Sequence, residues 1–166
     1  MKYLFALAFM WPFSPCFASD PSVVPSVNLE RYAGLWYQVA HFPSFFLNGC
    51  DSSTAEYSLN DDATVGVFNT CYKDGEVRST IRGKARAENP AEPAKLKVDF
   101  GFFAKGDYWI VALDEDYQWS VVSGPGRSSL FILSRQGPMD PVRLAEIVAK
   151  LKEDGFETEK IIYDKY

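Results

Sequence analysis

The chain has 166 residues, of which 47% are hydrophobic and 23% are charged, and this composition predicts one soluble globular domain. Its 17 basic and 22 acidic residues give a formal charge of −5, which excludes the basic surface that nucleic acid requires. A single histidine excludes multi-histidine metal sites, so we expect no metal and no other cofactor. The aromatic content of 16% predicts either a dense core or a cavity lined by rings.

The first segment has the layout of a targeting signal. Residues 1–18 place one lysine, a short apolar stretch and small residues before Ser19, which predicts a secretory signal peptide removed after Ala18. Cys16 offers an alternative, a lipid-modified cysteine that would tether the protein to a membrane. The residues before it, Phe-Ser-Pro, match a bacterial lipoprotein signal poorly. We therefore expect an exported protein without an anchor.

Two cysteines remain after removal of this segment. In an exported protein an isolated pair such as Cys50 and Cys71 is most simply a disulfide. The alternative is a nucleophilic thiol, which would need a second residue to lower the thiol pKa.

The rest of the chain reads as short strands. Residues 19–27 carry two prolines and predict an extended leader, and Asn28 can cap a helical turn that ends at Tyr32. Beyond this turn, alternating apolar and polar residues are separated by segments rich in Gly, Pro, Asp and Asn, as expected of an antiparallel sandwich or barrel. The eight predicted strands are 35–42, 53–59, 65–71, 77–87, 95–100, 107–113, 117–123 and 129–135.

Strand alternation assigns the inward faces. Leu96, Val98 and Phe100 alternate with polar neighbours and point inward. Small residues such as Gly83 and Ala85 also face inward, so the interior is not completely filled. A closed barrel of about eight strands can hold one small ligand in such a space.

One long connection and one helix complete the domain. Residues 43–52 form a long loop between the first two strands, with Phe45 and Phe46 in it, and long loops often act as lids or are pinned by a cross-link. Asp140 and Gly155 mark the ends of a helix whose apolar stripe can pack outside the barrel. Residues 160–163 predict a short final strand.

Three motifs in order now point to a known family. Gly34 and Trp36 form a Gly-x-Trp pattern at the start of the first strand, Asp114 and Tyr117 lie in an acidic turn, and Arg135 closes the last barrel strand. This arrangement resembles the lipocalins, and the resemblance covers the whole mature chain. It implies an all-β fold: an eight-stranded antiparallel up-and-down β-barrel, a C-terminal helix packed outside and a short final strand, with residues 28–166 as the lipocalin domain.

The resemblance is closer to one subgroup, the bacterial outer-membrane lipocalins and apolipoprotein D. The segments that carry it read RYAGLWYQVA, AEYSL, AKLKVDF, DYWIVALDEDY and LFILSR. It implies lipid storage or transport for membrane maintenance, in the periplasm or on the periplasmic face of the outer membrane. The poor lipid-attachment box and the cysteine pair depart from the subgroup.

The motif residues receive structural roles and the inward residues a ligand-binding role. Trp36 faces inward at the narrow end, where the Arg135 guanidinium can stack on its indole, and Gly34 allows a close approach. The expected ligand-binding residues are Gln38, Ala40, Tyr57, Val67, Asn69, Val98, Phe100, Phe131 and Leu133. Tyr57, Asn69 and Phe100 match pocket positions of apolipoprotein D, and Phe131 replaces a pocket tryptophan. Phe45 and Phe46 are candidates for contact with the ligand or with a partner surface.

Two functional hypotheses follow. The first is a binding protein that carries a fatty acid or lysophospholipid, with a membrane surface and a second copy of the chain as further candidate partners. The second is an enzyme on the same scaffold that uses a cavity thiol or His41. By alternation from Trp36, His41 faces outward as a surface histidine, and no nucleophile-base arrangement, carboxylate pair or phosphate loop is visible.

Overall fold

The computed structural model describes residues 19–166. The predicted signal peptide, 1–18, and the candidate anchor Cys16 lie outside the described residues. Residues 19–28 contain no helix or strand and run along the barrel, where the Val24 amide donates to the Ile110 carbonyl oxygen at 2.9 Å.

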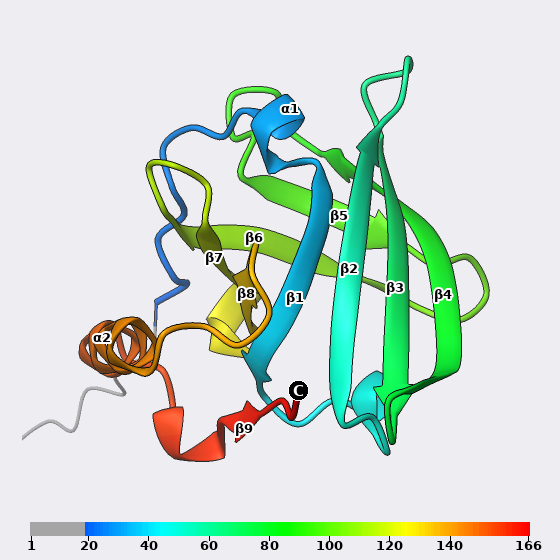
Figure 1. The fold of residues 1–166 in the computed structure, drawn as a ribbon. Helices are drawn as coiled ribbons and strands as arrows, with labels where there is room; N and C mark the ends of the chain where they lie inside the picture. Colours follow the sequence, from blue (N-terminus) through cyan, green and yellow to red (C-terminus); the bar gives the residue numbers. More distant parts are fainter. Residues whose placement is uncertain (1–18) are drawn as a thin grey trace, which may run out of the picture.

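Nine antiparallel strands build the fold (Figure 1). Eight of them form one sheet in the order β2-β3-β4-β5-β6-β7-β8-β1, and a β1–β2 pairing closes this sheet into a barrel. The strands are β1 (Gly34–His41), β2 (Ser52–Leu59), β3 (Val65–Lys73), β4 (Glu76–Ala87), β5 (Lys95–Asp99), β6 (Lys105–Leu113), β7 (Trp119–Ser123), β8 (Leu130–Ser134) and β9 (Ile162–Tyr163). The predicted eight-stranded up-and-down barrel is confirmed.

The observed strands differ from the predicted ones mainly at their ends. β7 begins at Trp119 because Tyr117 has a φ of +60° and belongs to the turn that precedes the strand. β6 begins at Lys105, inside the segment expected to be a turn. The final strand is limited to β9, since the 3-10 helix η3 (Thr158–Lys160) takes up the preceding residues.

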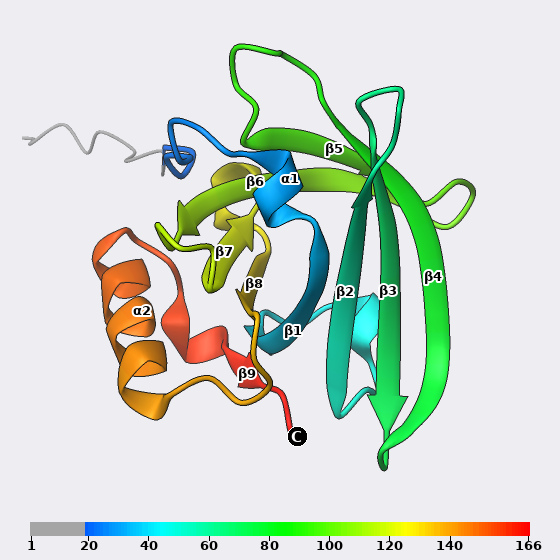
Figure 2. The same cartoon turned by 45° about the horizontal axis from the view of Figure 1, so that its top comes forward.

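Two α-helices flank the barrel. Helix α1 (Leu29–Tyr32) is capped by Asn28, whose Oδ1 accepts a hydrogen bond from the Arg31 amide at 3.0 Å. Helix α2 (Pro141–Glu153) is capped by Asp140, and it lies outside the barrel, as predicted (Figure 2). Its buried face packs against the outer side of β1 and β8, and this cluster includes Val39, Ile132, Ile147 and Leu151.

A β-bulge interrupts β1 and overturns two expectations. The register between β1 and β8 shifts between Gln38 and Ala40, so Val39 is an extra residue on the β1 side. One extra residue moves every later side chain to the opposite face. Ala40, expected inside the barrel, therefore packs under α2, and His41, expected at the surface, is buried. The alternation from Trp36 was wrong beyond Gln38 for this reason.

The barrel has two different ends, which follow from its up-and-down topology. The connections β2–β3, β4–β5 and β6–β7 share one end with α1, which we call the closed end. The connections β1–β2, β3–β4, β5–β6 and β7–β8 share the opposite end, the open end (Figure 1). In residues 19–166, no helix is both long enough and apolar enough to cross a membrane.

Candidate ligand-binding site

The barrel encloses a cavity of about 660 Å³. Strand residues line its wall, and the connections β1–β2, β5–β6 and β7–β8 surround its mouth at the open end. Nine residues expected in the cavity or its lid do line it: Gln38, Phe46, Tyr57, Val67, Asn69, Val98, Phe100, Phe131 and Leu133. Ala40 does not, because of the bulge, and Phe45 lies outside the lining.

The sequence interpretation missed several lining residues. The lining also includes Ser53, Ile81 and Tyr108, which were not among the expected ligand-binding residues. Phe103 lies in a segment treated only as a turn. A signal for it was present, because Phe102-Phe103 repeats the Phe-Phe pair of the β1–β2 connection.

A chain of hydroxyl groups lies at the inner end of the cavity. The Tyr108 hydroxyl donates to the Tyr57 oxygen at 3.0 Å, and the Tyr32 and Tyr108 oxygens are 2.8 Å apart. Ser120 Oγ lies 3.0 Å from the Tyr32 oxygen and extends the chain. Burial raises the pKa of Tyr32 to about 12 and moves the pKa values of Tyr57 and Tyr108 upward as well. The phenols are therefore neutral at physiological pH and act only as hydrogen-bonding groups.

Trp36 and Arg135 plug the closed end. Trp36 is fully buried, its Nε1 donates to the Tyr32 carbonyl oxygen at 2.8 Å, and the Arg135 guanidinium carbon lies 3.8 Å from the centroid of its indole. Arg135 also donates to the carbonyl oxygens of Leu35 at 2.9 Å and Arg31 at 2.7 Å. This arginine therefore ties the start of β1 to α1 while it covers the indole.

The other motif residues hold the adjoining turns. Gly34 has a φ of +95°, and a Cβ there would lie 3.3 Å from Arg135 Nη1. Asp114 Oδ2 accepts a hydrogen bond from the Gln118 amide at 3.1 Å, and the Tyr117 hydroxyl accepts one from the Asn28 amide at 2.9 Å. These contacts connect the β6–β7 turn to the N-terminal cap.

Gly83 allows one large ring to lie close to the cavity wall. A Cβ at this position would stand 2.6 Å from Phe100 Cδ1 and 2.7 Å from the Asp99 carbonyl oxygen. Only a residue without a side chain leaves room for Phe100 over β4. The small residue thus positions an aromatic side chain of the lining.

The cavity wall also carries polar atoms without partners. Ser53 Oγ and Asn69 Oδ1 are buried and have no hydrogen-bond partner within residues 19–166. Both residues line the cavity. A buried polar atom without a partner is costly. Asn69 Oδ1 can accept a hydrogen bond from a bound molecule or from water, and the Ser53 hydroxyl can donate or accept one.

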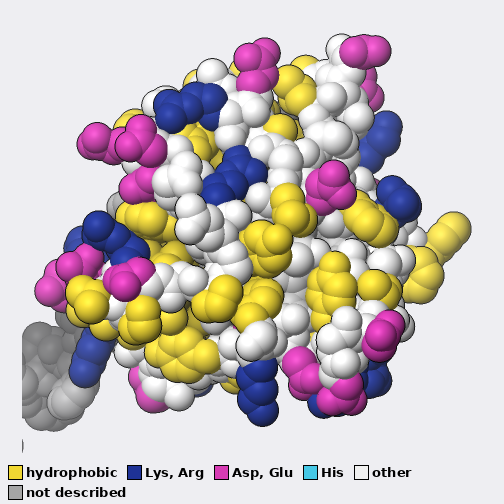
Figure 3. Space-filling model, viewed as in Figure 1, with side chains coloured by type: hydrophobic (Ala, Val, Ile, Leu, Met, Phe, Trp, Pro, Cys, Tyr) yellow, Lys and Arg dark blue, Asp and Glu magenta, His cyan; other side chains and the backbone are white. Residues whose placement is uncertain are grey.

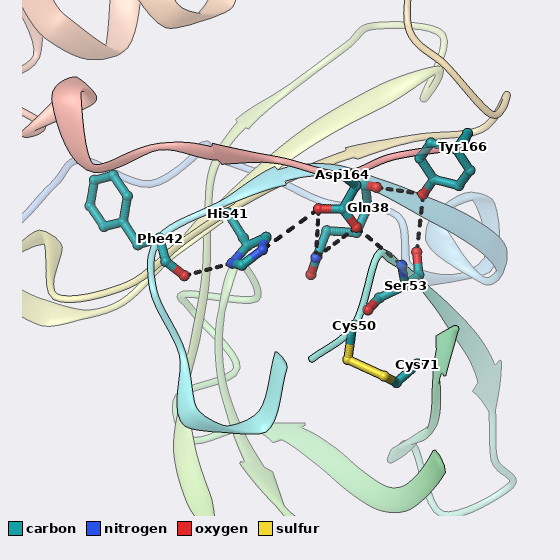
Figure 4. Close-up of polar contacts among 8 residues, drawn as sticks. All are labelled: Gln38, His41, Phe42, Cys50, Ser53, Cys71, Asp164 and Tyr166. Atoms are coloured by element: carbon teal, nitrogen blue, oxygen red, sulfur yellow. Dashed lines mark hydrogen bonds and ion pairs between the residues drawn. A yellow bond between two sulfur atoms is a disulfide. The ribbon is translucent and has the colours of Figure 1, made fainter. Parts of the chain in front are cut away.

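Two of the last five residues, Asp164 and Tyr166, contact Gln38 of β1 and Ser53 of β2 (Figure 4). The Asp164 amide donates to the Val39 carbonyl oxygen at 3.1 Å, and the Asp164 carboxylate accepts from Gln38 Nε2 at 3.1 Å and from the Ser53 amide at 3.0 Å. The segment 162–166 therefore links β1 to the start of β2. Burial raises the pKa of Asp164 to about 6, and His41 Nε2 lies 3.7 Å from the same carboxylate.

A disulfide fixes the loop at the mouth. Cys50 and Cys71 are bonded, with their Cα atoms 5.5 Å apart, and join the end of the β1–β2 connection to β3. The hypothesis of a reactive cavity thiol is therefore wrong, because neither cysteine is free. Within residues 19–166, no three His, Cys, Asp or Glu side chains come together in a way that could hold a metal ion.

Comparison with known proteins identifies the family to which this chain is similar. The model of the lipocalin-like domain matches residues 27–165. Temperature-induced lipocalin-1 of Arabidopsis thaliana is 40% identical over 86% of this chain and 81% of its own. The outer membrane lipoprotein Blc of Citrobacter freundii is 37% identical over 92% of this chain and 86% of its own. Apolipoprotein D of Mus musculus is 28% identical over 86% of this chain and 78% of its own.

Solved structures share the fold at lower identity. Insecticyanin from the tobacco hornworm Manduca sexta superimposes with a TM-score of 0.72 at 18% identity, over 92% of this chain and 88% of that one. At this identity, the likeness concerns the barrel and its helix. The resemblance inferred from the motifs and from the five segments is confirmed by these matches.

Proposed function

Because the chain belongs to the lipocalin family, we propose that it binds a fatty acid or a lysophospholipid in its barrel cavity. Lipocalins bind small hydrophobic ligands, and the finer assignment to a lipid is our own. The observation that carries it is the open cavity of about 660 Å³, whose lining is mainly apolar and aromatic with a few convergent polar groups. We further propose that the protein stores or transports lipid for membrane maintenance and is not an enzyme.

The binding energy would come from burial of an acyl chain. Each buried methylene contributes about 0.8 kcal/mol, so about fifteen of them supply about 12 kcal/mol, which leaves micromolar affinity after about 4 kcal/mol of ordering cost. Val67, Val98 and Phe131 offer apolar contacts for such a chain along three different strands. Ser53 Oγ and Asn69 Oδ1 offer partners to a hydroxyl or ester group of the ligand.

The polar head of the ligand would remain at the mouth. The lining includes one basic and one acidic residue, Lys105 and Asp107, and both lie at the start of β6. Lys105 pairs with Asp99 at 2.7 Å and Asp107 with Lys97 at 2.6 Å, so neither is an isolated buried charge. A head group with charges of both signs, as in a lysophospholipid, is compatible with this mixed pair.

The proposed place of action follows from the predicted signal peptide and from the relatives. The Citrobacter freundii relative is named an outer membrane lipoprotein. We propose that this protein is exported and acts in the periplasm or at the periplasmic face of the outer membrane. Attachment through Cys16 and a homodimer are alternatives that the experiments below can recognise.

Native mass spectrometry of the protein from its own source, followed by organic extraction, identifies the bound molecule. We expect one acyl lipid per chain, with its covalent structure unchanged. Half a ligand per chain would indicate that two copies share one lipid. A chemically altered lipid, or no lipid and no binding below about 100 μM, would contradict the carrier function.

A matched pair of charge substitutions tests the cavity itself. Phe131→Arg places a charge in the lining, where burial without a partner costs several kcal/mol, so lipid affinity should be lost. Val77→Arg places the same charge on an exposed position of β4 and should leave affinity unchanged. Calorimetric titration with a lysophospholipid below its micelle concentration measures both. Equal affinity of the two variants for the lysophospholipid would contradict lipid binding in the barrel cavity.

A further inference from the structure

Two pairs of adjacent phenylalanines project at the open end of the barrel. Phe45 and Phe46 lie in the 3-10 helix η1 (Phe45–Leu47) of the β1–β2 connection, and Phe102 and Phe103 lie in the β5–β6 connection. Phe45 is 87% exposed, Phe103 is 78% exposed and Phe102 is fully exposed. Hydrophobic side chains project from the outline of the molecule near the β5–β6 connection (Figure 3). These four residues, which we call the aromatic rim, contribute little to the core of the fold.

The two phenylalanine pairs of the aromatic rim lie on opposite sides of the mouth of the cavity. The β1–β2 and β5–β6 connections stand half-way round the barrel from each other, since four strands separate them in either direction. One ring of each pair, Phe46 and Phe103, lines the cavity, while Phe45 and Phe102 stand outside it. The Phe45 and Phe46 rings pack edge to face with centroids 5.9 Å apart. Apolar surface is therefore continuous from the outer rings into the cavity.

The aspartate beside each connection is paired with a lysine, and the Arg78 guanidinium lies beside Gly49 of the β1–β2 connection. Asp51, which follows the β1–β2 connection, pairs with Lys73 at 2.8 Å, and Asp99, which precedes the β5–β6 connection, pairs with Lys105 at 2.7 Å. The whole chain carries a formal charge of −5. Attraction to a strongly anionic surface is therefore not expected, and the rim offers apolar contact instead.

We propose that the aromatic rim docks the open end onto the surface of a lipid bilayer without net charge, so that a lipid can pass between the bilayer and the cavity. The proposal rests on the proposed function. A protein partner that covered both connections would also cover the mouth, whereas a bilayer in the same place supplies the ligand. Aromatic side chains with apolar bodies are suited to the interface of a bilayer, where a shallow insertion is reversible.

Co-flotation with phosphatidylcholine vesicles tests the proposal, using the chain without residues 1–18, the form expected after export. The double variant Phe45→Ser/Phe102→Ser removes the two rings that do not line the cavity. We expect its vesicle partition coefficient to fall about 100-fold, or about 2.8 kcal/mol. Val142→Ser, an exposed apolar residue on α2, is the matched control and should float like the parent.

Fluorescence and salt provide independent readouts. Phe102→Trp should show a blue-shifted emission when vesicles are added, while Val142→Trp should not. Binding should be unchanged between low and high salt. Equal flotation of the double variant and the parent, or binding that only anionic vesicles support and salt abolishes, would overturn the proposal. Ring-dependent self-association without vesicle binding in sedimentation velocity would instead assign the rim to a second copy of the chain.

A final measurement separates this proposal from the proposed function. Affinity for a monomeric lysophospholipid in solution should be the same, within about twofold, for the parent and the double variant, because the cavity lining is intact. Loss of solution binding in both, with ring-dependent flotation retained, would refute lipid binding in the cavity and leave the docking surface standing. Normal solution binding in both proteins, with flotation that does not depend on the two rings, would refute the docking surface and leave lipid binding in the cavity standing.

Discussion

Both ends of this barrel carry aromatic residues, but those at the closed end are buried and those at the open end are exposed. At the closed end, Trp36, Tyr32 and Arg135 are held by hydrogen bonds and by stacking, and the indole is fully buried. At the open end, the aromatic rim is exposed, and two polar atoms in the cavity wall have no hydrogen-bond partner in the part of the chain that the structure describes. Satisfied groups fix a fold, whereas exposed or unpaired groups are available to a ligand or a surface.

The comparison implies that buried, hydrogen-bonded packing is concentrated at the closed end, whereas the open end carries the groups available for binding and depends on the disulfide for support. The tyrosine hydroxyl chain is the boundary, because Tyr32 packs against Trp36 while Tyr57 and Tyr108 line the cavity. Substitutions on the two sides should therefore separate into those that change the free energy of unfolding and those that change affinity. Each prediction below tests that separation.

The largest effect is expected from Trp36→Ala. Removal of the buried indole leaves a cavity and takes away the stacking partner of Arg135, at a cost of about 3–5 kcal/mol. Phe46→Ala at the open end should cost less than about 1 kcal/mol, since that ring is 56% exposed. Urea denaturation followed by circular dichroism measures both. Similar urea midpoints for the two variants would contradict the different contributions of the closed-end and open-end rings to stability.

The disulfide is the main covalent support of the open end. Cys71→Ser opens a loop whose ends are 21 positions apart, and chain-entropy estimates give a loss of about 3 kcal/mol without loss of the fold. Cys50→Ser should have the same effect, and the double variant should be no worse than either. Titration of two free thiols in the unreduced native protein would contradict the pairing.

Asp164 should make stability depend on pH. Burial raises its folded pKa to about 6, so the folded state holds this proton more tightly than the unfolded state does. The resulting stabilisation is fully present below the ordinary aspartate pKa and is lost as the pH rises through about 6. Acidification from pH 7 to pH 4 should therefore stabilise the parent by about 1–2 kcal/mol relative to Asp164→Asn. A constant difference between the two proteins across this range would refute the prediction.

His41 lies beside the Asp164 carboxylate. Its Nε2 lies 3.7 Å from that carboxylate, and its Nδ1 lies 2.7 Å from the Phe42 carbonyl oxygen. Repeating the comparison with Asp164→Asn in a His41→Gln background shows how much of the difference the carboxylate contributes without the imidazole.

The smallest effect on stability is expected from Asn69→Ala. Loss of a buried oxygen without a partner should change the free energy of unfolding by less than about 1 kcal/mol, while affinity for a lipid with a hydrogen-bonding head should fall several-fold. Thermal denaturation and calorimetric titration give the two numbers. Tyr108→Phe, which breaks the hydroxyl chain, should lower the free energy of unfolding by about 1–2 kcal/mol and change lipid affinity less than Asn69→Ala does.

The sequence by itself determined the strands, the outer helix and eight of the nine expected ligand-binding residues, because these depend on local patterns. The barrel was implied by the resemblance of the motifs to a family. Two-residue alternation placed Val98 and Phe100 on the inner face, and Asp140 with Gly155 marked the helix. The Gly34, Trp36 and Arg135 motifs pointed to the family. The boundaries of the signal peptide and of the mature domain stay predictions.

Only the tertiary structure decided the features that depend on contacts between distant residues. The extra residue in β1, which turned Ala40 and His41 to new faces, appears only when β1 is paired with β8. Gln38 meets Asp164 across 126 positions, and that burial, invisible in the sequence, raises the carboxyl pKa. In the sequence, the two Phe-Phe pairs lie in separate connections between strands. Closure of the barrel places both connections at the mouth of one cavity. The two-residue period of a strand predicts which face each side chain is on. The residues that the side chain contacts are decided only when distant strands pair and the barrel closes.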